Sequence, residues 1–88
     1  MKVKYDEIVK YQDEFKERLP SDKAIEYIAL SRELMHQAID NENQLPDNNI
    51  YVTSNFSDDA IFYVFSKIYH KKISSIQKIG LNKNITFD

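Results

Sequence analysis

Pro20 separates two stretches of amphipathic helical sequence, and this arrangement constrains the fold more than any other feature of the chain. The residue before a proline is disfavoured in the α conformation, so a helix over residues 3–19 must end there. Ser21 is a good N-cap for a second helix that extends to about Asp40. Two helices joined by so short a link fold back as an antiparallel hairpin, which we assign to residues 1–42. Apolar residues recur at helical spacing in both stretches: Tyr5, Ile8, Phe15 and Leu19, then Ala24, Ile25, Ile28, Leu34, Met35, Ala38 and Ile39.

The second half of the chain contains a loop, a further helix and a short tail. Residues 43–56 are rich in Asn and Asp and end in "IYVTSNF", which predicts a loop followed by a short strand. Ser57 and the two aspartates after it start a third, basic helix, which we expect over residues 57–80 with Gly80 just past its end. A break near "HKK" into two shorter helices is the alternative. The tail, residues 81–88, contains "NITFD", which could pair with "IYVT" as a second strand.

The whole chain, residues 1–88, is expected to form a single domain, because 88 residues leave no room for a second core. With one glycine and two prolines, long helices are favoured over a β fold with many turns. We therefore predict a mainly α fold: an antiparallel helical hairpin plus a third helix, with a short two-stranded β ribbon as an option. A core of this size is thin, which favours a homo-oligomer.

Composition also indicates the cellular compartment that we expect for this protein. There is no cysteine, the first twenty residues are densely charged, and no apolar run approaches the roughly 20 residues that span a bilayer. We expect a cytoplasmic protein with no membrane partner, in the host cell cytoplasm if a phage encodes it.

The net charge of −2 is divided unevenly along the chain. Residues 1–63 contain seven Lys and Arg against thirteen Asp and Glu, whereas residues 64–88 contain five lysines and one aspartate. A local basic patch attracts phosphate groups or an acidic partner. Lysines near the end of a helix also complement its dipole, so a solvated helix face explains the same pattern. The candidate phosphate or partner contacts are Lys67, Lys71, Lys72 and Lys78.

No catalytic or metal motif is present in the sequence. There is no Gly-rich phosphate loop and no zinc-ligand spacing, and neither His36 nor His70 has a second ligand nearby. The adjacent pairs Asp13–Glu14 and Asp58–Asp59 would point about 100° apart on a helix, so they cannot act as a carboxylate dyad. We predict a protein that is not an enzyme and uses no cofactor or metal.

The span "LPSDKAIEYIALSRELMHQAID", residues 19–40, resembles the helical-hairpin signature of the phage anti-CBASS sponge family. "ALSR" is similar to the core of that family's second helix, "LMHQAI" to its ending, and "VKY" at residues 3–5 to the start of its first helix. The resemblance implies a counter-defence protein that sequesters a cyclic oligonucleotide immune signal without cleaving it, in a helical homo-oligomer. It also implies ligand contacts at Lys4, Tyr5, Ser31 and Arg32.

A cyclic di- or trinucleotide carries several phosphates, and therefore needs Lys or Arg donors and aromatic rings that stack on its bases. Two alternatives remain open. One is a small protein inhibitor of the anti-CRISPR or toxin-neutralising type, which would bind a host defence protein. The other is a small RNA- or DNA-binding protein that uses the basic segment 64–83.

Overall fold

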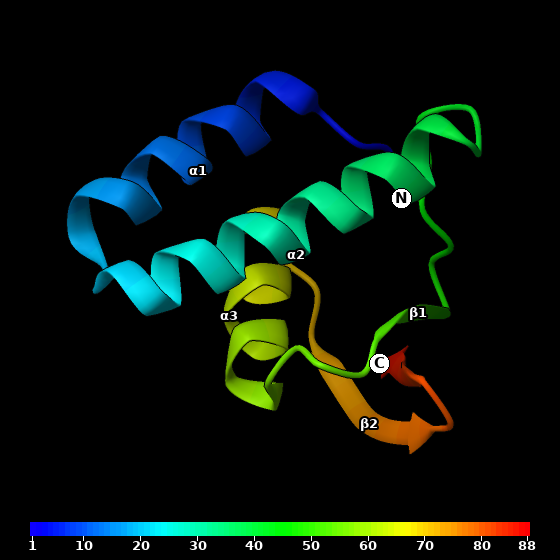
Figure 1. Cartoon of the computed structure of the whole chain (residues 1–88). Helices are drawn as coiled ribbons and strands as arrows, with labels where there is room; N and C mark the ends of the chain where they lie inside the picture. The colour runs from blue at the N-terminus through cyan, green and yellow to red at the C-terminus, as the bar shows by residue number, and fades with distance from the viewer.

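The first half of the computed structural model, which describes all residues from 1 to 88, is an antiparallel helical hairpin (Figure 1). It consists of α1 (Tyr5–Arg18) and α2 (Ser21–Ile39). Leu19 is extended, with φ −106° and ψ 153°, as expected of a residue before proline. Pro20, rather than Ser21, occupies the N-cap position of α2, and no side chain caps that end. The predicted cap is therefore wrong, although the helix begins where the sequence indicates.

The second half contains β1 (Asn49–Thr53), α3 (Asp58–Tyr69), β2 (Ile73–Ile79) and β3 (Asn82–Phe87). The strands form one antiparallel sheet in the order β1-β3-β2, so the last strand of the chain is the central one. Ile50 pairs with Ile85, and Ile76 pairs with Ile85 from the other side. The pairing of "IYVT" with "NITFD" is present, but within a three-stranded sheet.

This sheet corrects the predicted fold class, because three helices and a three-stranded sheet make an α+β fold rather than a mainly α one. The predicted helix over 57–80 ends at Tyr69, and His70 stops it with a left-handed backbone, φ 53°. Residues 73–79 are a strand, and the predicted tail, 81–88, contains the central strand of the sheet. Gly80, expected just past a helix, instead lies with φ 61° in the tight turn between β2 and β3.

The core lies between the three helices and one face of the sheet. Ile50 and Val52 of β1 and Ile85 and Phe87 of β3 alternate toward it, as one face of a half-buried antiparallel sheet does. The helices contribute the other fully or nearly fully buried side chains, among them Ile8, Phe15, Tyr27, Leu30, Leu34, Ile61, Val64 and Phe65. Burying about twenty apolar residues in this way is the main source of stability for so small a chain.

The start of α3 is fixed by polar contacts of the Ser57 hydroxyl and the Ser57 backbone N–H. The Ser57 hydroxyl accepts a hydrogen bond from the Ala60 N–H at 3.1 Å, which is the N-cap bond that the sequence predicts. The Glu26 carboxylate of α2 in turn accepts the Ser57 N–H at 3.0 Å. The outward face of α3 is therefore held at a defined position beside the hairpin. None of the three helices combines the length and apolar character needed to cross a lipid bilayer.

Candidate functional site

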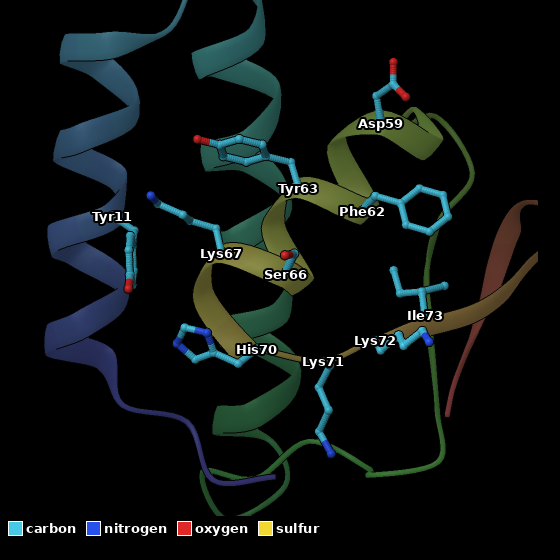
Figure 2. A pocket seen from close by; sticks show the side chains of 10 residues that line it. All are labelled: Tyr11, Asp59, Phe62, Tyr63, Ser66, Lys67, His70, Lys71, Lys72 and Ile73. Carbon is cyan, nitrogen blue, oxygen red and sulfur yellow. The ribbon is translucent and has the colours of Figure 1, made fainter.

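An open groove of about 940 Å³ lies over the outward face of α3 (Figure 2). Residues of α3 at three- and four-residue spacing form its floor, as one face of a helix requires. Tyr11 of α1 borders it on one side, and the segment that leads into β2 borders it on the other. We call this feature the α3 groove; its lining residues are Tyr11, Asp59, Phe62, Tyr63, Ser66, Lys67, His70, Lys71, Lys72 and Ile73.

The groove has two sides that differ in character (Figure 2). On one side the Lys67 side chain extends toward Tyr11 of α1, with Tyr63 nearby on α3. On the other side Phe62 and Ile73 lie near each other. Phe62 is 49% exposed, a large exposure for a phenylalanine in a chain with so little core. Phe62 is three residues from Phe65, a spacing that fits one helix face, yet Phe65 is fully buried whereas Phe62 faces the groove.

Tyr63 belongs to an aromatic cluster that fixes its ring. Its ring centroid lies 5.0 Å from that of Tyr27 and 5.6 Å from that of Phe15, in tilted and edge-on arrangements typical of aromatic pairs. Burial, followed by the nearby carboxylates of Asp59 and Glu26, raises the pKa of Tyr27, which therefore keeps its proton. Tyr63 thus presents a rigid ring to the groove.

The lysines of the groove take part in loose ion pairs. Lys67 lies 3.4 Å from Glu14, Lys71 lies 3.7 Å from Asp47, and Lys72 lies 3.6 Å from Asp88. By contrast, Lys83 outside the groove donates to Asp58 at 2.8 Å. Exposed ion pairs contribute little, about 0–1 kcal/mol each, so the groove lysines can exchange these partners for a more strongly charged anion.

Asp47, the partner of Lys71, is held mainly by another group. The N-terminal ammonium of Met1 lies 2.7 Å from its carboxylate. The hydrogen bond and charge of this ammonium, with a smaller effect of Lys71, hold the pKa of Asp47 below its usual value. Asp47 would keep its partner if Lys71 turned to a ligand.

Lys78 does not belong with the other three lysines of the predicted cluster. It lies in β2, where it is exposed and pairs across the sheet with Lys83. The structure brings Lys67, Lys71 and Lys72 to one groove and places Lys78 outside it.

The four residues implied by the sponge resemblance do not converge on one site. Ser31 is fully buried; its hydroxyl accepts from the Gln12 amide at 2.8 Å and donates to the Ile28 carbonyl at 2.7 Å. Arg32, next to it, is exposed and forms no ion pair. Tyr5 donates to the Asn43 side chain at 2.7 Å, at the far end of α2. Because α2 rises about 1.5 Å per residue, Arg32 and the Tyr5 hydroxyl contact lie more than about 10 Å apart along the hairpin.

Lys4 lies at a second, smaller cavity of about 160 Å³ beneath the end of α3. His70 lines both this cavity and the α3 groove. Tyr69 also lines the small cavity, and its hydroxyl is buried without a hydrogen-bond partner. Burial, with a smaller effect of Tyr5, raises the pKa of Tyr69 well above its usual value. No pattern in the sequence singles out this tyrosine.

Several groove residues could not be selected from the sequence. Asp59 and Ser66 have no motif around them, and Ile73 joins them only because α3 ends at Tyr69 and the chain turns back. The available signal was the spacing of residues 59, 62, 63, 66, 67 and 70, which share one helix face.

The comparisons with known proteins add no relative. No protein-family model matches the chain, and neither a curated protein nor a solved structure matches it. No group of three or more His, Asp or Glu side chains is placed to hold a metal ion. The residues of the site are therefore identified from their geometry and not from a relative.

Proposed function

We propose that this chain is a small α+β binding protein that holds a cyclic oligonucleotide in the α3 groove and sequesters it without cleaving it. The ligand class is the one implied by the resemblance of residues 19–40 to the anti-CBASS sponge family, and a role in counter-defence is the setting that this resemblance suggests. The binding residues differ from those that the resemblance implies, because they come from α3 and the segment after it.

One observation carries the proposal: a single open groove combines three lysines and a histidine with three aromatic rings. Small-molecule sites are typically about 300–1,000 Å³ and combine apolar walls with a few polar groups. The volume of about 940 Å³ falls within this range. Phosphates need cationic donors and bases need flat apolar surfaces, and the groove offers both along α3 and the segment that follows it.

The lysines suit phosphate groups because their present partners hold them weakly. Lys71 and Lys72 are consecutive, and their side chains diverge at the end of α3 (Figure 2). Lys72 is highly exposed, with 86% of its side chain accessible. A phosphate placed here would gain the charge of both without displacing a buried contact.

The aromatic rings suit the bases. Phe62 is exposed and is not held in the aromatic cluster, so a base could stack on its face, an interaction of about 1–3 kcal/mol per base. On the other side, Tyr63 and Tyr11 flank Lys67 (Figure 2). Two aromatic positions on either side of a cationic floor would suit a ligand with two bases joined by phosphates.

The test is calorimetric titration of cyclic di-AMP, cyclic di-GMP and a cyclic triadenylate into the parent chain and two variants. Lys71→Ala/Lys72→Ala removes two groove cations, while Lys78→Ala removes a lysine of the same basic segment that lies outside the groove. We expect the parent to bind at least one of these ligands, the double variant to lose at least about tenfold in affinity, and the Lys78→Ala variant to bind as the parent does. Phe62→Ala should also weaken binding.

Two outcomes would contradict the proposal. If none of the three cyclic nucleotides binds the parent, the ligand class is wrong, and a protein partner becomes the better explanation of the groove. If Arg32→Ala abolishes binding while the Lys71→Ala/Lys72→Ala variant binds normally, the ligand sits on the hairpin. Titration with a single-stranded RNA tests the alternative of a nucleic-acid-binding protein that uses residues 64–83. RNA affinity through that whole basic segment would weaken with the Lys78→Ala change and fall steeply with salt.

A further inference from the structure

The rest of the molecule covers one edge of the sheet and leaves the other uncovered. In the order β1-β3-β2, both β1 and β2 are edge strands. Side chains of α2 cover the outer edge of β1: the Glu33 carboxylate accepts the Thr53 N–H at 2.8 Å, and the Gln37 amide donates to the Tyr51 carbonyl at 2.7 Å. Two backbone groups on this edge are therefore already used.

The outer edge of β2 has no such cover. No side chain reaches its backbone from outside the sheet, and the one side-chain bond of the strand, from the Ser74 hydroxyl to the Thr86 carbonyl, points inward to β3. None of the residues of Ile73–Ile79 is buried. The strand has no proline, and Lys78 is its only charged residue. An edge of this kind exposes a row of unpaired N–H and C=O groups that another strand can join.

We propose that β2 pairs with β2 of a second copy of this chain, antiparallel and about a two-fold axis. The pairing joins two three-stranded sheets into one continuous sheet. A two-fold contact of this kind uses the same surface on both copies, so the strand must be complementary to itself.

The sequence "ISSIQKI" of β2 satisfies this requirement when the axis passes through Ile76. Ile76 then faces Ile76 of the second copy, Ser75 faces Gln77, and Lys78 lies opposite Ser74. Shifting the axis to Gln77 would place Lys78 opposite Ile76, an apolar residue against a charge. Polar and apolar residues therefore match in one register and not in its neighbour.

The position of Ile76 in the sheet gives the same register a packing advantage. Ile76 pairs with Ile85, a fully buried residue of the central strand, so it lies on the core face of the sheet. It is only half-buried in one copy, because no strand lies on its other side. A second Ile76 directly opposite would cover this exposed part and continue the apolar row from one core into the other.

The irregularity between Ile73 and Ser75 sets the length of the contact. A β-bulge bends an edge strand and interrupts its ladder. Ser75–Ile79 pair with β3 in unbroken register, so Ile76, through which the proposed axis passes, lies within the regular part of β2. Lys78 does not obstruct the pairing, because its partner Ser74 is neutral and lies at the bulge.

The test uses charges at the two positions that face each other only in the proposed register. In Ser75→Lys/Gln77→Lys, two lysines of one copy oppose two of the other, whereas in Ser75→Glu/Gln77→Lys each glutamate faces a lysine. Both positions are exposed and pair within the chain with the uncharged Thr86 and Asn84, so the fold of one copy should tolerate both changes. Asn48→Lys/Asn55→Lys, in exposed loops, adds the same charge away from the edge.

Sedimentation equilibrium of the full chain measures the result. We expect a dimer of the 10.4 kDa parent at tens of micromolar, a dissociation constant raised about tenfold or more in the Lys/Lys variant, and recovery to the parent value in the Glu/Lys variant. The loop variant should behave as the parent. A monomeric parent would overturn the proposal, as would a dimer that survives the Lys/Lys change. A Glu/Lys variant that stays as weak as the Lys/Lys variant would reject the register centred on Ile76.

Discussion

Glu33 of α2 accepts two hydrogen bonds from Thr53 of β1, one from its backbone N–H at 2.8 Å and one from its hydroxyl at 2.6 Å. Glu26, seven residues earlier and therefore on the same face of the helix, accepts two bonds from Ser57 in the same manner. These two carboxylates hold both ends of the short link between β1 and α3. The position of α3, and with it the groove, depends on this pair.

We expect Glu33→Ala to lower the free energy of unfolding by about 1 kcal/mol, because a charged acceptor with two partners is lost at a partly exposed position. Chemical denaturation measures the change. Glu17→Ala, which removes a carboxylate without a hydrogen-bond partner from α1, serves as the control and should have little effect. Equal stability of the two variants would mean that the Thr53 contacts contribute nothing beyond surface charge.

Two isoleucines three residues apart on α2 allow a matched test of the core. Ile28 is 8% exposed, whereas Ile25 is 70% exposed. Ile28→Ala should cost about 2–5 kcal/mol, as large-to-small changes in a core do, and Ile25→Ala should stay within about 0.5 kcal/mol of the parent. Urea unfolding of both variants measures these losses. Similar losses for both would contradict the structure, because they would mean that α2 is rotated about its axis so that Ile25 is buried as well.

Asp47 should make stability depend on acid pH. Its pKa is lowered in the folded state by the Met1 ammonium, so the folded chain binds fewer protons than the unfolded chain near the ordinary value of 3.8. Its contribution is therefore complete above that value and is lost as the pH falls through the lower folded pKa. We expect Asp47→Asn to melt at a lower temperature than the parent near neutral pH, and the two melting curves to converge in strong acid.

Acetylation of the N-terminal amine provides the control for this prediction. Removing the ammonium should make the parent resemble Asp47→Asn at neutral pH, because the main cause of the shift is gone. A difference between parent and variant that stayed constant across the acid range would show that Asp47 contributes through some property other than its charge.

Local signals were sufficient for the first half of the fold. Pro20 forces Leu19 out of the helix, and the apolar spacing on both sides of it defines the two helices. Ser57 and the strand-forming residues around Ile50 gave the start of α3 and the position of β1. Each of these features depends on residues close together in the sequence.

The end of α3 could not be predicted in the same way. Ile73 and Ile76 are three residues apart, which fits a helix, yet they pair with Phe87 and Ile85, which are two apart on one face of β3. The β-bulge between them adds the extra residue, so a strand reproduces the spacing of a helix. His70 ends α3 in a left-handed conformation that glycine or asparagine usually adopts, so the break near "HKK" stayed an alternative to the single helix.

The groove was predicted in part for the same reason. The lysine cluster was visible in the sequence, but the helix expected to extend to residue 80 placed Lys78 with the others. The chain instead reverses after Tyr69, which brings Ile73 back beside Phe62 and sends Lys78 along the sheet. Which lysines share a site depends on that reversal, and long-range pairing with β3 determines it.

The central position of β3 has a consequence for how the chain folds during synthesis. Ile50 and Val52 leave the ribosome long before Ile85, which lies beside them in the finished sheet. Until β3 follows, β1 has no strand partner, and its apolar side chains can be covered only by the helices, all of which precede β3 in the chain. The sheet can therefore form only when almost the whole chain is available, as expected for contacts between residues distant in sequence.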